Sequence, residues 1–188
     1  MPYNKKIARP RRGWYAASPR GRIVGRESVT GTANAGRTWQ DDVGALRRAK
    51  PRHILFLCVG NSARSQMAEG IARSLAPKGV RISSAGAVPT SVRPEAVQVL
   101  AEIDIDISRQ RAKSIASLDG ANTVEAVITL CAEEVCSVFL RRVLQLHWPL
   151  PDPSAVADEG QRLAAFRAVR DALRVRLKAL FKEWPGTT

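Results

Sequence analysis

Short apolar segments alternate with amphipathic ones from residue 52 almost to the C-terminal end. Four runs have the length and composition of buried strands: HILFLCV (53–59), VRISSAG (80–86), EAVITLC (125–131) and VLQLHW (143–148). Helical periodicity separates or follows them at three places: residues 65–75, 94–102 and 158–184. Buried parallel strands need crossover connections and covering helices on both faces. The alternation therefore predicts a three-layer α/β/α fold around a four-stranded parallel sheet.

Residues 1–50 differ in composition from the rest. They hold 12 Lys/Arg and 3 Asp/Glu, so +9 of the chain's net charge of +13 lies in this part. Their Arg-, Gly- and Ser-rich segments keep neither helical nor strand periodicity for long. We expect residues 1–50 to be a basic, disordered N-terminal extension, or upstream sequence included by a misplaced start codon, and residues 51–188 to form the domain. The alternative is a basic arm that binds nucleic acid.

The sequence shows no run of apolar residues long enough for a membrane span and no secretory signal, so we expect a cytoplasmic protein. It has three cysteines, Cys58, Cys131 and Cys136. An odd number in such a protein indicates thiol chemistry, a metal site or plain burial rather than a disulfide framework. Zinc is disfavoured because no fourth ligand lies at finger spacing. We therefore expect no metal.

The turn after the first predicted strand places a thiol and a guanidinium close together. Cys58 ends the strand and Arg64 opens the following helix. A helix N-terminus and inward-turned N–H groups bind anions, and the Arg fork can hold two oxygens. The same field favours the nucleophilic thiolate, to which Ser65 can donate a hydrogen bond. The pattern predicts an oxyanion-binding loop made of Val59, Gly60, Asn61, Ser62, Ala63, Arg64 and Ser65.

A second candidate group follows the fourth predicted strand. Asp152 lies between Pro151 and Pro153, and the two prolines restrict the loop that carries it. A carboxylic acid at this edge of the sheet can protonate a leaving oxygen. Taken alone, an aspartate in such a loop is more often a turn or capping residue.

Several segments resemble one family of enzymes. CVGNSARSQMAEG (58–70) is similar to the anion-binding loop of arsenate reductases that share the low-molecular-weight tyrosine phosphatase fold. The resemblance continues, in order, through ISSAG (82–86), RPEAVQVLAEIDIDIS (93–108), VITLCAEEVC (127–136) and HWPLPDPS (147–154). It covers about residues 52–182. The letters SQMAEG are typical of the reductases, whereas the phosphatases usually carry Ser-Pro there.

The resemblance implies an arsenate reductase that works as a monomer. Cys58 would attack arsenate, which shares its loop with phosphate and sulfate, and Asp152 would act as general acid. Cys131 would then attack Cys58 as arsenite leaves, and Cys136 would resolve the disulfide. No cofactor would be bound, and an external thiol reductant such as thioredoxin would reopen the disulfide. A helix would keep the last two cysteines too far apart for a disulfide, so we expect a mobile, non-helical loop at 131–136.

Two alternatives stay open. A tyrosine or small-molecule phosphatase would use Cys58, Arg64 and Asp152 alone. A non-enzymatic protein would bind anions or nucleic acid through its basic extension.

The resemblance also allows a prediction about a potassium site. Some relatives hold potassium near the loop with an Asn, a Glu, a Ser and an Asp. Asn61, Glu69 and Ser84 match these positions, but Lys113 stands at the Asp position. We therefore expect no potassium site, with the Lys113 ammonium in the place of the ion.

Overall fold

The structure is a computed structural model that describes residues 37–131 and 143–184. Its helices and strands, in chain order, are α1 (Trp39–Ala49), β1 (His53–Cys58), α2 (Arg64–Leu75), β2 (Arg81–Gly86), α3 (Pro94–Ala101), the 3₁₀ turn η1 (Ala121–Thr123), β3 (Ala126–Thr129), β4 (Leu144–His147), the 3₁₀ turn η2 (Pro153–Ala155) and α4 (Glu159–Phe181). No helix in these ranges is both long and apolar enough to cross a lipid bilayer.

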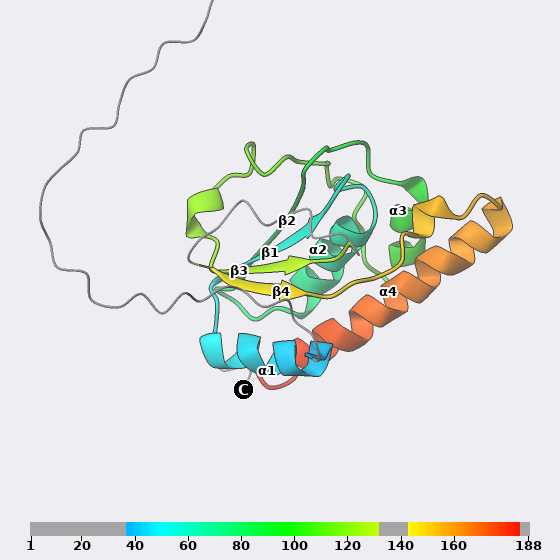
Figure 1. The fold of residues 1–188 in the computed structure, drawn as a ribbon. Coiled ribbons are helices and arrows are strands. Elements are labelled where there is room, and N and C mark those ends of the chain that lie inside the picture. The colour runs from blue at the N-terminus through cyan, green and yellow to red at the C-terminus, as the bar shows by residue number, and fades with distance from the viewer. Residues whose placement is uncertain (1–36, 132–142, 185–188) are drawn as a thin grey trace, which may run out of the picture. The chain divides into compact units, whose positions relative to one another are not determined.

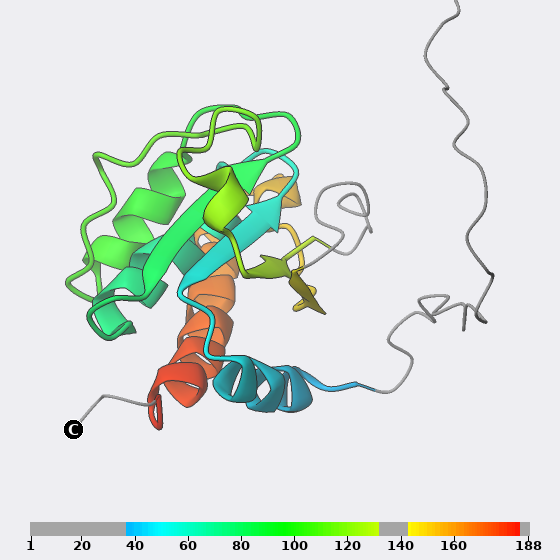
Figure 2. The same ribbon diagram turned by 90° about the vertical axis from the view of Figure 1, so that its left-hand side faces the viewer.

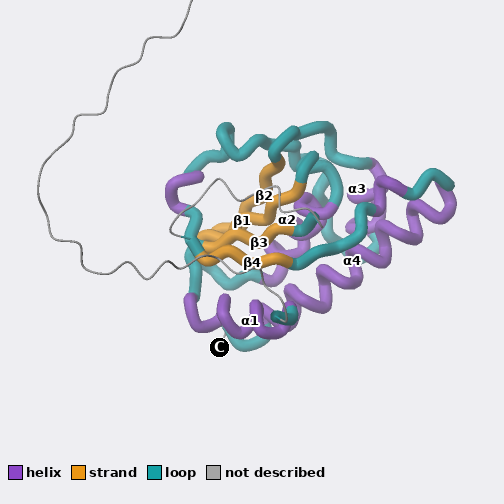
Figure 3. The backbone as a smooth tube through the Cα atoms, viewed as in Figure 1, coloured by secondary structure: helices purple, strands orange, loops and turns teal. Residues whose placement is uncertain are grey.

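The four strands form one parallel sheet in the order β2-β1-β3-β4 (Figures 1 and 3). β1 lies in the interior, paired with β2 from His53↔Arg81 to Cys58↔Gly86 and with β3 on its other side. All six β1 residues are buried, as the continuous apolar run predicts. β4 is an edge strand that pairs only with β3. The predicted four-stranded parallel sheet is thus confirmed.

The two faces of the sheet have separate cores. Ile54 and Phe56 of β1 pack in the larger core, which includes residues from α1, α2, α3 and α4. Leu55 and Leu57 point to the opposite face, as the two-residue period of a strand requires, and pack with residues of 115–124. The predicted stripe on α4 is buried in the larger core: Phe166, Val169, Leu173, Leu177 and Leu180.

Helix α1 lies within the part expected to be a disordered extension. Thr38 begins it with a capping box, in which the Thr38 side chain and Asp41 accept from each other's main-chain N–H groups. Val43 and Leu46 are buried in the core, and α1 lies beside the C-terminal end of α4 (Figures 1 and 2). The prediction is therefore wrong for residues 37–50, because apolar side chains at i and i+3 fix this helix to the domain. Residues 1–36 lie outside the described residues.

Candidate active site

The predicted oxyanion loop lies at the carboxyl end of β1, where α/β folds place their ligands. It opens on a cleft of about 620 Å³ whose lining includes Cys58. Five of the seven predicted loop residues line this cleft: Val59, Gly60, Ser62, Ala63 and Arg64. Asn61 and Ser65 are fully buried and do not line it. Five residues of the predicted loop therefore line the cleft, and the other two, Asn61 and Ser65, are buried beneath it.

The start of α2 and the carbonyl groups of the loop differ in their hydrogen bonding. Helix α2 starts at Arg64 without a side-chain cap, so the first N–H groups of the helix are not used by a capping side chain. Carbonyl groups of the loop bond instead to the neighbouring segment: Val88 N donates to Val59 O (2.9 Å), Thr90 N to Gly60 O (3.0 Å) and Arg93 N to Ser62 O (2.9 Å). With these carbonyls engaged, the loop suits a bound anion.

Two backbone positions allow this tight loop. Asn61 has φ +43°, a left-handed conformation that Asn tolerates better than most residues. Gly86, at the end of β2, passes so close to the loop that a Cβ there would lie 2.6 Å from Val59 O and 2.7 Å from Asn61 N. A side chain at residue 86 would therefore push the loop away from the sheet.

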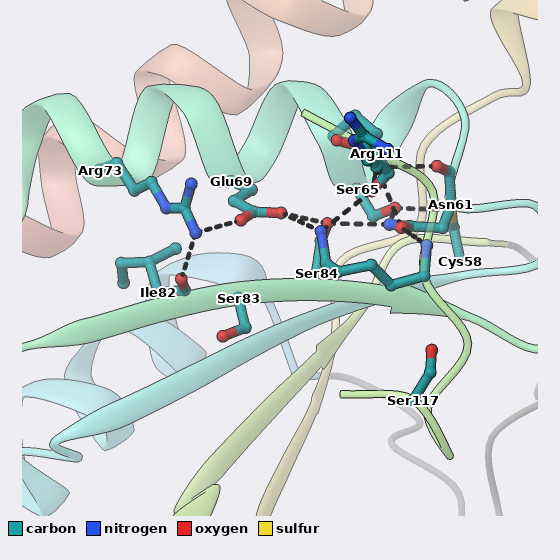
Figure 4. A network of polar contacts seen from close by, with 12 residues as sticks. Cys58, Asn61, Ser65, Glu69, Arg73, Ile82, Ser83, Ser84, Arg111 and Ser117 are labelled. Atoms are coloured by element: carbon teal, nitrogen blue, oxygen red, sulfur yellow. Dashed lines mark hydrogen bonds and ion pairs between the residues drawn. The ribbon is translucent and has the colours of Figure 1, made fainter. Parts of the chain in front are cut away.

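A polar network supports the thiol from behind (Figure 4). Cys58 Sγ and Ser65 Oγ are 2.8 Å apart, and Asn61 Nδ2 donates to Ser65 Oγ at 2.9 Å. Because Ser65 Oγ already accepts from Asn61, its proton is well placed for the Cys58 thiolate, which can only accept. Asn61 Nδ2 also donates to Ser84 Oγ at 2.8 Å. The predicted contact of Ser65 with the thiol is thus present.

The amide oxygen of Asn61 is held as well. It accepts from Gln66 Nε2 at 3.0 Å and from the main-chain N–H of Lys113 at 2.7 Å. These partners come from α2 and from a segment 52 residues further along the chain. Hydrogen bonds therefore hold both the nitrogen and the oxygen of the Asn61 amide, and the amide nitrogen in turn orients the Ser65 hydroxyl.

Protein groups surround Glu69, one of the residues that match the potassium ligands of some relatives. The Glu69 carboxylate is 1% exposed, and its two oxygens meet Arg73 Nη2 at 2.5 Å and Lys113 Nζ at 3.3 Å. The Ser84 hydroxyl also donates to it (Figure 4). A buried carboxylate needs such compensation, and here two cationic side chains supply it. The Lys113 ammonium thus contacts the carboxylate at this position. That no potassium binds here stays a prediction.

Asp152 and Arg64 both line the cleft and contact each other. Arg64 is 9% exposed; its Nη2 lies 3.1 Å from Asp152 Oδ2, and its Nη1 donates to Leu150 O at 3.1 Å. Asp152 also accepts from the Ser154 N–H at 3.0 Å as the cap of η2. The structure therefore brings the predicted acid to the predicted anion site, and Asp152 caps a turn as well.

Cys131 lines the same cleft as Cys58. It is 3% exposed and follows β3 by two residues, after Leu130, whose N–H donates to Leu57 O in β1. The two cysteines thus approach one cleft from neighbouring strands. Cys136, and the predicted loop between it and Cys131, lie outside the described residues.

Three polar lining residues were not predicted: Thr90, Arg93 and Ser154. Arg93 adds a second guanidinium, and its Nε is buried without a hydrogen-bond partner among the described residues. The carboxylate atom Glu95 Oε2 lies 3.9 Å from Arg93 Nε. The only sequence signal for Arg93 is its place before Pro94, at the start of a predicted helix, and that position says nothing about a ligand.

Comparisons with known proteins identify the family of the chain. The pattern of the family described as low molecular weight phosphotyrosine protein phosphatase matches residues 53–185. The chain belongs to this family. Sequence relatives within the phosphatase-like family include an arsenate reductase of Bacillus subtilis (strain 168), 41% identical over 66% of this chain and 91% of the relative. An arsenate reductase of Staphylococcus aureus (strain N315) is 35% identical over 66% of this chain and 92% of its own length.

Solved structures agree with the family assignment. One described as an arsenate reductase in the phosphate binding state has a TM-score of 0.60 and 32% identity, and the match covers 70% of this chain and 98% of that one. Another, an arsenate reductase in the oxidized state, has a TM-score of 0.61 and 30% identity over the same shares. A tyrosine phosphatase of Erwinia amylovora, 19% identical with a TM-score of 0.59 over 72% of this chain and 94% of that one, shares the fold.

Proposed function

We propose that this protein reduces arsenate to arsenite, with Cys58 as the nucleophile. The observation that carries the proposal is the shared cleft: Cys58, Arg64 and Cys131 all line it. A phosphatase needs one cysteine and water, whereas a reductase needs a second thiol within reach of the first. The names of the sequence relatives, which are arsenate reductases, support the same choice.

The first step joins sulfur to arsenic. Arg64 and the N–H groups at the start of α2 hold the oxyanion, and the Cys58 thiolate attacks arsenic. The S–As bond forms as an As–O bond breaks, and Asp152 gives its proton to the departing oxygen, which leaves as water. The contact between Asp152 and Arg64 supports this role. Ser65 stabilises the thiolate before the attack.

The second step transfers the electrons. The Cys131 thiolate attacks Cys58 Sγ, so an S–S bond forms as the S–As bond breaks. The electron pair of that bond stays on arsenic, which falls from the +5 to the +3 state and leaves as arsenite. Two thiols are oxidised to one disulfide, which balances the two electrons.

The third step restores the enzyme. Cys136 attacks Cys131 and frees Cys58, a role that rests on the family resemblance. An external dithiol protein then reduces the Cys131–Cys136 disulfide. Thioredoxin suits this step because its potential, about −270 mV, is low enough to reduce many protein disulfides. The reducing environment that this cycle needs is the cytoplasm.

We also propose that the catalyst is a monomer, as the family resemblance implies. The proposal includes no bound cofactor, because the thiols supply the electrons. We also propose that residues 1–36 are not needed for this chemistry, because the region that matches the family begins at residue 53.

The test is arsenite formation from arsenate with thioredoxin, thioredoxin reductase and NADPH. We expect turnover by the wild type, and none by Cys131→Ser or Cys136→Ser. Hydrolysis of p-nitrophenyl phosphate by all three proteins, without arsenite from any of them, would instead identify a phosphatase with two non-catalytic cysteines.

A further inference from the structure

Four consecutive carbonyl groups of the predicted oxyanion loop accept hydrogen bonds, and one of them differs from the others in its donor. Three accept from main-chain N–H groups of the segment 88–93: Val59 O, Gly60 O and Ser62 O. Asn61 O accepts instead from a side chain, with Gln66 Nε2 at 2.9 Å. Asn61 is fully buried, so its carbonyl needs a donor from the protein. The direction of the Asn61 carbonyl therefore depends on Gln66.

Three acceptors fix the side-chain amide of Gln66, which is fully buried in the first turn of α2. Besides Asn61 O, its Nε2 donates to Asn61 Oδ1 and to Arg111 O, each at 3.0 Å. A main-chain carbonyl can only accept, so the amide nitrogen of Gln66, and not its oxygen, must face these groups. Gln66 Oε1 is buried and makes no hydrogen bond within the described residues. The amide thus holds Asn61 while its own oxygen stays unpaired.

Holding the Asn61 carbonyl also orients the N–H group of Ser62. The two groups belong to one planar trans peptide unit, so they point in opposite directions. Because the carbonyl is directed to Gln66, the Ser62 N–H is directed away from that side chain. Ser62 lines the cleft, and within the part of the chain that the structure describes its N–H donates to no other group. This N–H is therefore a donor that an anion in the cleft can use.

We propose that Gln66 is a positioning residue for the reaction: it fixes the Asn61–Ser62 peptide unit and thereby directs the Ser62 N–H to the bound oxyanion. This inference rests on the proposed function, because it takes the loop as the site of that anion. A donor held in place beforehand needs no reorientation when the anion binds, so it stabilises the anion more than a mobile donor would. Gln66 also holds the Asn61 amide whose nitrogen donates to Ser65, and so it supports the hydroxyl beside the thiol.

Gln66→Met separates this role from a contribution to stability, because Met keeps a long, flexible side chain but has no amide. Asn61 Oδ1 and Arg111 O each keep a donor from Lys113, its main-chain N–H at 2.7 Å and its Nζ at 3.1 Å. Asn61 O alone loses its donor, and the unpaired Gln66 Oε1 is removed at the same time. These two effects on stability oppose each other, so we expect a Tm within about 5 °C of the wild type.

The test measures how well inorganic phosphate protects Cys58 of the full chain against alkylation by iodoacetamide. Phosphate is the probe because a reductase and a phosphatase would both bind it in this loop. For Gln66→Met we expect the phosphate concentration that halves the alkylation rate to rise by about tenfold, because a preorganised hydrogen bond to a charged ligand is lost. Met67→Leu, which changes a side chain of the same helical turn that is buried in the larger core, should keep the wild-type concentration.

A second measurement needs no variant. In the isotope-labelled wild type, the amide proton of Ser62 should shift downfield in the NMR spectrum when phosphate is added, because it then donates to an anion. An unshifted Ser62 amide proton would overturn the positioning role, as would an unchanged phosphate concentration in Gln66→Met or an equal rise in Met67→Leu. If phosphate failed to protect Cys58 in the wild type, the anion site of the proposed function would be refuted, and this inference with it.

Discussion

Arg64 Nη2 lies 3.1 Å from Asp152 Oδ2, so the group proposed to bind the anion contacts the group proposed to act as the acid. We expect an oxyanion bound by Arg64 to lie beside this carboxylate. The anion and the acid are thus coupled through one guanidinium. The same guanidinium bonds to Leu150 O, which keeps the loop closed on the site.

Ser65→Ala should reduce the reactivity of the catalytic thiol. The hydroxyl lies 2.8 Å from Cys58 Sγ, and a hydrogen bond to a charged group contributes more than one between neutral groups. We expect alkylation of Cys58 by iodoacetamide at pH 7 to slow by about tenfold. Ser62→Ala is the control, because Ser62 lies in the same loop without contacting the sulfur. Equal alkylation rates in wild type and Ser65→Ala would contradict the assignment.

Arg93→Ala should weaken substrate binding. Arg93 lines the cleft, and its buried Nε has no hydrogen-bond partner in the part of the chain that the structure describes. We expect an anion there to gain a second guanidinium. We expect KM for arsenate to rise by about tenfold with a smaller change in kcat, and Arg93→Lys to recover part of the loss. Arg109→Ala, outside the cleft, serves as the control. An unchanged KM in Arg93→Ala would show that this side chain does not reach the substrate.

Potassium should not stabilise the wild-type protein. Lys113 Nζ and Arg73 Nη2 already compensate the Glu69 carboxylate. We expect equal Tm values in KCl and NaCl at matched ionic strength. Lys113→Asp, by contrast, supplies the missing oxygen ligand, and we expect its Tm to be lower and to rise in KCl relative to NaCl. A potassium-specific increase in the wild type would refute this account of Glu69.

Stability should depend on pH through His53. Burial, together with Arg81, lowers the pKa of this histidine against the opposing effect of Glu125. In the unfolded chain this histidine takes up a proton near pH 6.5, whereas in the folded chain it does so only at lower pH. The contribution of His53 to the free energy of unfolding is therefore fully present above pH 6.5 and is lost as the pH falls below it. We expect the Tm of wild type to fall more between pH 7.5 and about 5 than that of His53→Gln. His147→Gln, which alters the other histidine, should keep the wild-type dependence; if His53→Gln kept it too, His53 would not be the group responsible.

The fold could be predicted from the sequence because its signals are local. The buried run 53–58 and the helical stripe of 159–181 each report their own structure, and the elements fall within a few residues of the predicted ranges. Helix α1 was missed although Thr38 and Asp41 form a capping box with apolar Val43 and Leu46 behind it. The apolar pattern of this helix is short, and the basic, Gly-rich composition of the preceding residues favours disorder.

The site was predictable only in its contiguous part. Cys58, Arg64 and Ser65 belong to one strand-loop-helix unit, so their spacing indicates their geometry. The partners that orient Asn61 come from Ser84 and Lys113, far along the chain, and only the fold brings them together. Arg93 was missed for the same reason.

The most direct test of the account is to count thiols and arsenite in one turnover without reductant. We predict that each wild-type chain releases one arsenite and loses two thiols, and that Cys131→Ser releases none. Release of arsenite by Cys131→Ser, or turnover without thiol loss in the wild type, would contradict the transfer of electrons from Cys58 and Cys131.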